Sequence, residues 1–340
     1  MPLFTIQRDT LPLRRPWPVP GSGTLRRRAV GYVVGLDESH RTVAIGEAAP
    51  ALGRGETIDQ AIHWMRQHAH SAGLTDHAAL MEWLSRQNGV PRAAAAAFET
   101  AALDFQARRA GLPLWRHLSL PCPDGAPIPV VLAPADLKDY EADLELHERA
   151  PVLLLRLGMA GPERDLDCVK LARIKTDAAL RVHAGGAWRP DRVLDLVRAV
   201  AALGVEYIEQ PLPPGQLEAM TALRAQSPVA LFLDQDVAAA EDVERAAPAC
   251  DGVRLTLQRC GGITALLRAM IRARELGLLV TLGCDLESPV SATAAAHLAA
   301  LADYCDFGAT AFLENTAYQG LRLQSGALVV PPDPGIGVSQ

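Results

Sequence analysis

Eight short apolar segments at nearly regular intervals constrain the fold of this chain more than any other feature. They begin near residues 128, 152, 179, 206, 229, 252, 278 and 304. Amphipathic helices fit between most of them, over 161–176, 190–203, 214–225, 239–247, 262–276 and 289–302. A repeat of roughly 25 residues is typical of strand–helix units in a parallel sheet. Even spacing favours an α/β fold with a closed (β/α)7β-type TIM-like barrel over an open sheet with reversed strand order.

The first third of the chain has a different pattern. Residues 29–35 and 42–46 read as paired strands, and helical patterns follow over 57–71, 76–86 and 91–109. We therefore expect an N-terminal α+β capping domain over 1–120 and a barrel domain over 121–314. The Gly- and Pro-rich stretch 315–340 contains one strand-like piece, and we expect it to return and pack on the cap.

Composition excludes several classes of partner. The net charge is −6, which gives no general attraction to nucleic acid, and the apolar runs are too short to span a membrane. The first residues lack the basic, apolar and small-residue pattern of a signal peptide, so we expect none, and the six cysteines form no CxxC pair. These features predict a cytoplasmic protein with hydrophobic residues, 49% of the chain, forming a large core.

Polar and charged residues stand at the ends of the predicted strands. The carboxyl ends of parallel strands share one face of a barrel, so these side chains should converge. They are Arg156, His183, Glu209, Asp234, Thr256, Asp285, Glu287 and Asp306. Glu209 and Asp234 suit a hard divalent cation, and the imidazole of His183 would shift the preference toward Mn, Fe or Zn. The alternative is that these groups form salt bridges at the barrel rim.

Short motifs follow one another along nearly the whole chain. They are GEAAP at 46–50, GET at 55–57, AAFETAALD at 96–104, GLPLW at 111–115, EQP at 209–211, QRCGG at 258–262, GCDLES at 283–288, AAAHL at 294–298 and PGIGV at 334–338. In this order and spacing the sequence resembles the enolase superfamily, in its muconate-lactonising-enzyme and dipeptide-epimerase subgroup. The resemblance implies Mg²⁺ held by three carboxylates, and a pair of lysines on barrel strands 2 and 6 that act as acid and base across a carboxylate substrate.

The two lysines of that chemistry are absent. The Lys-x-Lys motif on strand 2 is replaced by Leu154-Leu155-Arg156, and the lysine on strand 6 aligns with Thr256. Arginine has a pKa above about 12, so Arg156 is a poor base but a good carboxylate clamp. A threonine hydroxyl is no base without a partner. We therefore do not carry the acid–base roles over to these two residues.

The metal ligands implied by the resemblance are also altered. The first carboxylate, in an Asp-Ala-Asn segment, aligns with His183-Ala184-Gly185, whereas the second and third are retained as Glu209 and Asp234. The usual Asp-Glu-Ser reads Asp234-Gln235-Asp236, and the Asp-x-Asp that holds a substrate amino group on strand 8 reads Asp306-Phe307-Gly308. Neutral imidazole removes one negative charge and weakens the hold on Mg²⁺. The predicted ligands are His183, Glu209 and Asp234, with Mg²⁺ expected from the resemblance and Mn²⁺ or Zn²⁺ as alternatives, or with no metal bound.

Two functions remain open at this stage. The first is an isomerase or lyase that acts on a small carboxylate held by Arg156, Thr256 and Asp306, with Asp236, Asp285 or Glu287 as the base. The second is a non-catalytic binding protein on the same fold. Substrate identity would depend on the segments 17–28 and 49–54, whose composition names no molecule. Relatives with this architecture commonly assemble, so a homo-oligomer is compatible with the resemblance.

Overall fold

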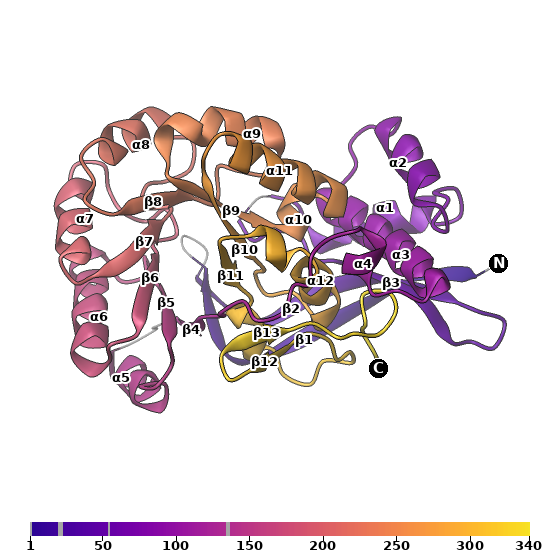
Figure 1. Cartoon of the computed structure of the whole chain (residues 1–340), viewed down its shortest axis with the longest axis horizontal. Coiled ribbons are helices and arrows are strands. Elements are labelled where there is room, and N and C mark those ends of the chain that lie inside the picture. The colour runs from indigo at the N-terminus through magenta and orange to yellow at the C-terminus, as the bar shows by residue number, and fades with distance from the viewer. Residues whose placement is uncertain (1, 20–22, 54, 134–136) are drawn as a thin grey trace.

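The computed structural model describes residues 2–19, 23–53, 55–133 and 137–340 (Figure 1). The N-terminal part is a three-stranded antiparallel sheet in the order β1-β2-β3, covered by three helices. These elements are β1 (Leu3–Val19), β2 (Gly23–Leu36), β3 (Thr42–Ala48), α1 (Ile58–His68), α2 (His77–Ser85) and α3 (Arg92–Ala110). The two strands and three helices predicted for this part are confirmed, and the structure adds the long strand β1 beside them.

Local sequence explains where the cap helices begin and end. Thr57 caps α1 in a capping box with Gln60, so each side chain satisfies a backbone N–H that the first turn leaves unpaired. Helix α3 is rich in alanine and buried on almost every side. It ends at Gly111, whose φ of 68° is left-handed and therefore favours glycine.

Helix α3 lies close against β3 because Gly46 has no side chain. A Cβ atom at Gly46 would lie 1.9 Å from the Ala97 carbonyl oxygen, which is helical backbone and cannot rotate away. We expect Gly46→Ala to lower the free energy of unfolding by about 1–3 kcal/mol, the range for overpacked cores. Gly31→Ala is the matched control, because its Cβ would come closest to side-chain atoms, Cγ1 of Ile62 at 2.9 Å and Cε of Met65 at 3.1 Å, which can shift more easily than backbone. Urea unfolding of both variants measures the difference; equal midpoints would contradict the argument.

The remainder of the chain is dominated by an eight-stranded parallel sheet. Its strands are β4 (Val130–Leu132), β5 (Val152–Arg156), β6 (Ala179–His183), β7 (Val205–Glu209), β8 (Ala230–Leu233), β9 (Gly252–Thr256), β10 (Leu279–Gly283) and β11 (Tyr304–Asp306). Neighbours in sequence are neighbours in the sheet throughout, as in a barrel. The predicted β/α architecture is confirmed as a curled parallel sheet of barrel type, in which no strand pairing joins β4 to β11 within the described residues.

Helices follow the strands; α5 to α9 and α11 cover the outside of the curled sheet, whereas α10 and α12 lie between the sheet and the cap elements α3 and β3 (Figure 1). They are α5 (Leu137–Leu146), α6 (Pro162–Lys175), α7 (Val193–Ala201), α8 (Leu217–Arg224), α9 (Ala240–Ala246), α10 (Leu257–Cys260), α11 (Ile263–Glu275) and α12 (Pro289–Ala296). Helix α5 was not foreseen, because its sequence is mostly polar and its apolar pattern is weak. No helix in the described ranges is both long and apolar enough to cross a membrane.

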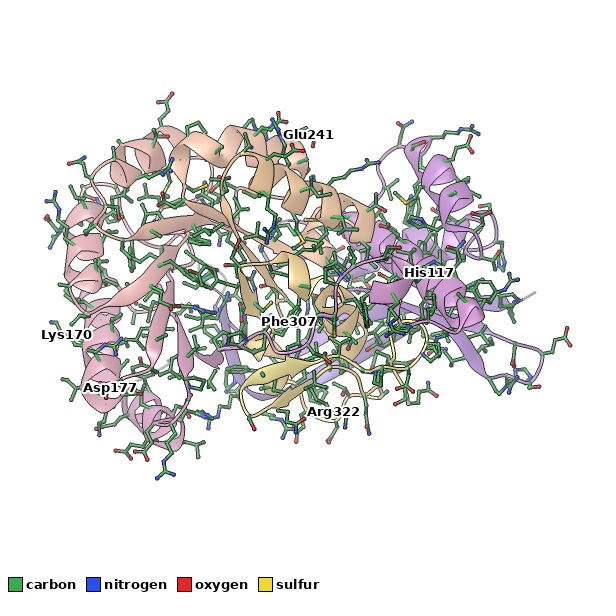
Figure 2. All side chains as sticks on the ribbon, viewed as in Figure 1. His117, Lys170, Asp177, Glu241, Phe307 and Arg322 are labelled. Carbon is green, nitrogen blue, oxygen red and sulfur yellow. The ribbon has the colours of Figure 1, made fainter. Side chains whose placement is uncertain are left out.

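The two edge strands of the curled sheet, β4 and β11, approach each other through close packing of the residues beside them. A Cβ atom at Gly308, just after β11, would lie 2.5 Å from the Pro129 carbonyl oxygen and 2.6 Å from Cγ2 of Val131 in β4. Phe307 is fully buried near the centre of the molecule, whereas Lys170 and Glu241 project from the outer helices (Figure 2). The sheet therefore encloses its own core.

The C-terminal segment contacts the cap. It contains the short strands β12 (Arg322–Gln324) and β13 (Ala327–Val329). It is hydrogen-bonded to α4 (Leu114–His117), because Leu114 N–H donates to the Gly335 carbonyl at 2.7 Å. Ile336 N–H donates to the buried carboxylate of Asp104 on α3. These bonds tie the chain end to the cap helices, although the division at 120 and 314 stays a prediction.

Candidate functional site at the mouth of the barrel

Three strand ends lie level at one end of the sheet. Arg156 pairs with His183, and His183 pairs with Glu209, across neighbouring parallel strands. Asp234 follows β8, and its Oδ2 lies 3.2 Å from Nε2 of His183. The same imidazole nitrogen lies 3.8 Å from Oε2 of Glu209. The convergence expected from the strand ends is therefore present, in a fully buried environment.

The centre of this group is occupied by Arg254 of β9, which the sequence analysis did not single out. Its side chain is completely buried. Its guanidinium contacts carboxylates from four different segments. Nη1 lies 3.3 Å from Asp234 and 3.4 Å from Asp285, Nη2 lies 3.1 Å from Asp306, and Nε lies 3.9 Å from Glu209. We call Arg254, Arg259, Glu209, Asp234, Asp285 and Asp306 the arginine–carboxylate cluster.

A second guanidinium comes from Arg259 on α10. Its Nη1 donates to the Asp234 carbonyl at 2.8 Å and also contacts the Asp234 carboxylate, while Nη2 lies 3.6 Å from Asp285. Thr256 positions this helix, because its hydroxyl oxygen caps α10 by accepting from the Arg259 N–H. Thr256 thus serves the local fold at the position where the family resemblance would place a lysine.

The charges in the cluster set the protonation of its acids. Burial opposes ionisation of Asp234, but Arg259 and Arg254 outweigh it and hold the Asp234 pKa well below its usual range. The Asp285 pKa is lowered in the same way, against burial, by the two arginines. Burial raises the pKa of Glu209 to about 8, despite the opposing charge of Arg254. Within the described chain, neither carboxyl oxygen of Glu209 has a hydrogen-bond partner.

The surroundings of His183 favour its neutral form. Burial lowers its pKa, the nearby charge of Arg156 lowers it further, and the hydrogen bond to Asp234 only partly opposes these effects. Because the Asp234 pKa is held well below its usual range, its carboxylate can only accept, so Nε2 of His183 is the donor in the hydrogen bond between them.

Glu287 lies beside the cluster, at the joint with the cap. Ser291 donates to its carboxyl group, and Glu47 of β3 and Asp285 add negative charge nearby. Burial, together with Glu47 and Asp285, raises the pKa of Glu287 to about 8. Among the predicted bases, Glu287 therefore has a pKa close to the pH at which an enzyme works, which is the condition for efficient proton transfer.

Asp236 is not brought to the cluster. Its carboxylate accepts from the Gln210 amide at 2.7 Å and from Gly215 N–H at 2.6 Å, and it lines a surface pocket with Asp242. Gln210 has a left-handed φ of 44°, and its amide oxygen accepts from Asp234 N–H. Asp236 therefore braces the backbone that carries Asp234, and its position does not support the predicted role as a base.

Arg156 differs from the two buried arginines. Its guanidinium is partly exposed and lies 4.7 Å from the ring centroid of Trp17, on β1 of the cap. Among the residues that the structure describes, none forms a hydrogen bond or an ion pair with it. Its charge nonetheless acts on Glu209 and Asp285, whose pKa values it lowers. Arg156 is thus a positive group at the mouth whose guanidinium N–H groups have no hydrogen-bond partner among the described residues.

A divalent cation requires carboxylate oxygens that are free to coordinate it. The carboxylate of Asp234 is already engaged by Arg254, Arg259 and His183, and Arg254 also faces Glu209. Over the described residues, no group of three or more His, Cys, Asp or Glu side chains is arranged so that it could hold a metal ion. This arrangement does not fit a divalent cation, and the ligand roles of His183, Glu209 and Asp234 stay a prediction from sequence.

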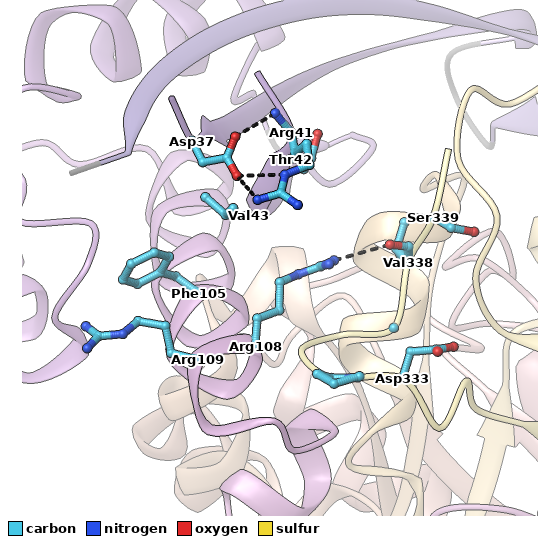
Figure 3. Close-up of a pocket in the computed structure, with 12 residues that line it drawn as sticks. Asp37, Arg41, Thr42, Val43, Phe105, Arg108, Arg109, Asp333, Val338 and Ser339 are labelled. Carbon is cyan, nitrogen blue, oxygen red and sulfur yellow. Dashed lines mark hydrogen bonds and ion pairs between the residues drawn. The ribbon is translucent and has the colours of Figure 1, made fainter. Parts of the chain in front are cut away.

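A large hollow lies elsewhere on the molecule. A cavity of about 790 Å³ opens between the β2–β3 turn, the end of α3 and the C-terminal segment (Figure 3). Asp37, Arg41 and Arg108 line it, with Arg108 held by the Val338 carbonyl. None of the residues that converge at the barrel mouth lines this cavity. Of the two segments expected to set substrate identity, residues 20–22 and Arg54 lie outside the described residues.

A parallel barrel with an α+β cap and polar strand ends defines a class of enzymes, and comparison with known proteins agrees with it. Residues 144–340 match the model of the "Enolase C-terminal domain-like" family. The L-Ala-D/L-amino acid epimerase of Pedosphaera parvula is 31% identical over 87% of this chain and 86% of its own. The hydrophobic dipeptide epimerase of Roseobacter litoralis is 31% identical over 89% of this chain and 85% of its own.

Solved structures give the same result for the fold. The dipeptide epimerase of Cytophaga hutchinsonii, solved with Mg and the dipeptide D-Ala-L-Val, superposes with a TM-score of 0.89 at 21% identity, over 99% of this chain and 95% of that chain. The chain belongs to the enolase superfamily, in the subgroup of muconate-lactonising enzymes and dipeptide epimerases. The resemblance inferred from the sequence motifs is therefore confirmed.

Proposed function

We propose that this protein acts on a small carboxylate bound at the barrel mouth by Arg156, through chemistry other than the two-lysine proton transfer implied for its relatives. The observation that carries the proposal is the state of Arg156. Its guanidinium lies over the ring of Trp17, 4.7 Å from the centroid, and its charge acts on Glu209 and Asp285. Within the described residues it has no anionic partner. An arginine in that state is suited to bind a carboxylate with two parallel hydrogen bonds.

The lysine content of the chain supports a changed mechanism. The sequence contains three lysines, Lys138, Lys170 and Lys175, and none stands at the end of a barrel strand. Lys170 and Lys175 lie on α6 and pair with surface acids. A racemase or epimerase needs an acid and a base on opposite faces of the reacting carbon. No lysine at a strand end can fill either role here.

We assign proton transfer to Glu287 in a reaction that needs one acid–base group, such as an isomerisation or an elimination. Asp285 is held in its ionised form by two arginines, which makes it a weak base. Asp236 is engaged elsewhere. Glu287, whose pKa is raised to about 8, can both accept and return a proton near neutral pH.

A second candidate is a binding protein that holds a small carboxylate without transforming it. It is favoured by one observation: Asp234, Asp285 and Asp306 each contact Arg254, so these three acids are neutralised by the protein itself. Under this candidate, Arg156 keeps its role and Glu287 has none.

The proposal is tested with the dipeptide D-Ala-L-Val and a panel of N-acyl amino acids. We expect no exchange of the α-proton in D2O by NMR, because the lysine pair is missing. Isothermal titration with the panel should reveal a carboxylate ligand, and Arg156→Met should weaken its binding about tenfold or more, as for loss of a charge-assisted hydrogen bond. Arg116→Met, which removes another arginine stacked on a tryptophan (Trp115), should bind as the wild type does. Rapid α-exchange, or undiminished binding by Arg156→Met, would overturn the proposal.

The same panel separates the two candidates. If a ligand that binds is converted, and Glu287→Gln stops the conversion while binding is kept, the enzyme is supported. If every ligand that binds is recovered unchanged, the binding protein is supported.

A further inference from the structure

We infer that the guanidinium of Arg254, supported by Arg259, takes the place of a divalent metal cation at the centre of the barrel mouth. The inference concerns the charge that organises the site and does not depend on which carboxylate the site binds or whether it is transformed. It follows from two observations. The carboxylates at the mouth are of the kind that bind a metal cation, but Arg254 and Arg259 already contact them.

The geometry of Arg254 is that of a central cation. Its three guanidinium nitrogens reach carboxylates from β7, the end of β8, the β10–α12 connection and β11, at 3.1–3.9 Å. A side chain in an ordinary rim salt bridge has one such partner and remains partly solvated. Arg254 has four such partners and no exposed surface.

The surrounding backbone accommodates the guanidinium. Gly283 on the neighbouring strand lacks a side chain, and a Cβ atom there would lie 3.0 Å from Nη2 and 3.2 Å from Nε of Arg254. The next residue, Cys284, accepts from Nη2 through its carbonyl oxygen at 2.8 Å. The glycine and the carbonyl hold the guanidinium plane in position, so Arg254 is a built feature of the site.

Arg259 adds a second positive charge on the same acids. Both guanidinium groups contact Asp234 and approach Asp285. A divalent cation bound to these carboxylates would lie against two fixed positive charges and would have to displace their hydrogen bonds. Like charges at such separations, with little solvent between them, repel strongly. Metal binding and the present arrangement therefore exclude each other.

A prediction follows for the protein without Arg254. Removal of the guanidinium leaves buried carboxylates short of positive charge, and such a group of acids recruits a cation. Arg254→Asn should therefore be less stable than the wild type and should gain stability from added Mn²⁺. The wild type should gain no stability from Mn²⁺, because Arg254 already neutralises its buried carboxylates.

The experiment measures the melting temperature of EDTA-treated full-length protein with and without Mn²⁺. For the wild type we expect no shift. For Arg254→Asn we expect a lower melting temperature that rises by about 5 °C or more at Mn²⁺ concentrations well above the dissociation constant. Arg254→Lys retains the charge and should respond no more than the wild type. Arg181→Asn is the matched control, since Arg181 is another buried arginine on a barrel strand, paired with Glu206. It should be destabilised without responding to Mn²⁺.

Two outcomes would overturn the inference. One is a rise in the melting temperature of the wild type with Mn²⁺ that Glu209→Gln abolishes, because a metal would then bind beside the guanidinium. The other is an Arg254→Asn protein that is as stable as the wild type and indifferent to Mn²⁺, because the acids would then need no cation. If Arg254→Asn is recovered only when Mn²⁺ is present during refolding, the inference is supported, since Arg181→Asn provides the comparison for general loss of folding.

Discussion

Asp234→Asn is expected to lower the free energy of unfolding by about 3–5 kcal/mol, the range for removing one partner of a buried ion pair. Asp234 is contacted by Arg254, Arg259 and His183, and all four side chains are buried. Asparagine has nearly the same shape but no charge. The variant therefore removes one of the two anions that the buried guanidinium groups of Arg254 and Arg259 share, and leaves Asp285 as the other. It creates no cavity to which a loss could be attributed.

Urea unfolding measures this effect through the shift in midpoint. Glu206→Gln is the comparison, because Glu206 also pairs with a buried arginine, Arg181, but is itself 38% exposed. Its loss should cost about 1 kcal/mol or less, since water and salt screen an exposed charge. Equal costs for the two variants would show that the cluster adds nothing beyond a surface salt bridge.

Glu287→Gln should change how stability depends on pH. The pKa of Glu287 is raised to about 8 in the folded protein by burial and by the nearby Glu47 and Asp285, whereas the usual value is 4.5. Between pH 4.5 and pH 8, the folded protein keeps a proton that the unfolded chain has released. The wild type therefore loses stability as pH rises through this window, by up to about 1.4 kcal/mol per pH unit from this group.

Glutamine carries no titrating proton, so Glu287→Gln lacks this contribution. Its stability relative to the wild type should increase steadily from pH 5 to pH 8. Glu209, whose pKa is also raised by burial, remains in both proteins and is not among the groups that shift the Glu287 pKa, so its pH dependence cancels in the comparison. Denaturant titrations at several pH values provide the measurement. A difference between the two proteins that is constant with pH would mean that Glu287 is ionised in the folded state.

Sequence patterns predicted the architecture well, because the same strand–helix pattern occurs several times along the chain. Each strand–helix unit is a separate signal, and an error over one of them, such as the missed helix α5, leaves the barrel intact. The convergence of His183, Glu209 and Asp234 was equally accessible, since parallel strands must end on the same face. Both predictions depend on backbone topology alone.

The content of the site was harder to predict. Arg254 was not predicted, because the prediction considered only the residues at the end of each strand, and Arg254 stands two residues before Thr256. Alternation along β9 places both residues on the same face, so the inward position of Arg254 could have been inferred. Its partners could not, because they depend on side-chain directions in four segments. Asp236 shows the opposite error: a carboxylate two residues from Asp234 turns away to hold Gln210.

The contact between Arg156 and Trp17 joins the two parts of the fold at the point where a ligand would bind. Arg156 belongs to the barrel and Trp17 to the first strand of the cap. Under the proposed function, a carboxylate that binds Arg156 would also act on the packing of Trp17, so ligand binding and the docking of this cap strand would be thermodynamically linked. In such a protein, the affinity for the ligand depends on both the barrel and the cap that is docked on it. Substitutions along β1 can weaken binding without touching the ligand, and the ligand in turn protects the cap from unfolding.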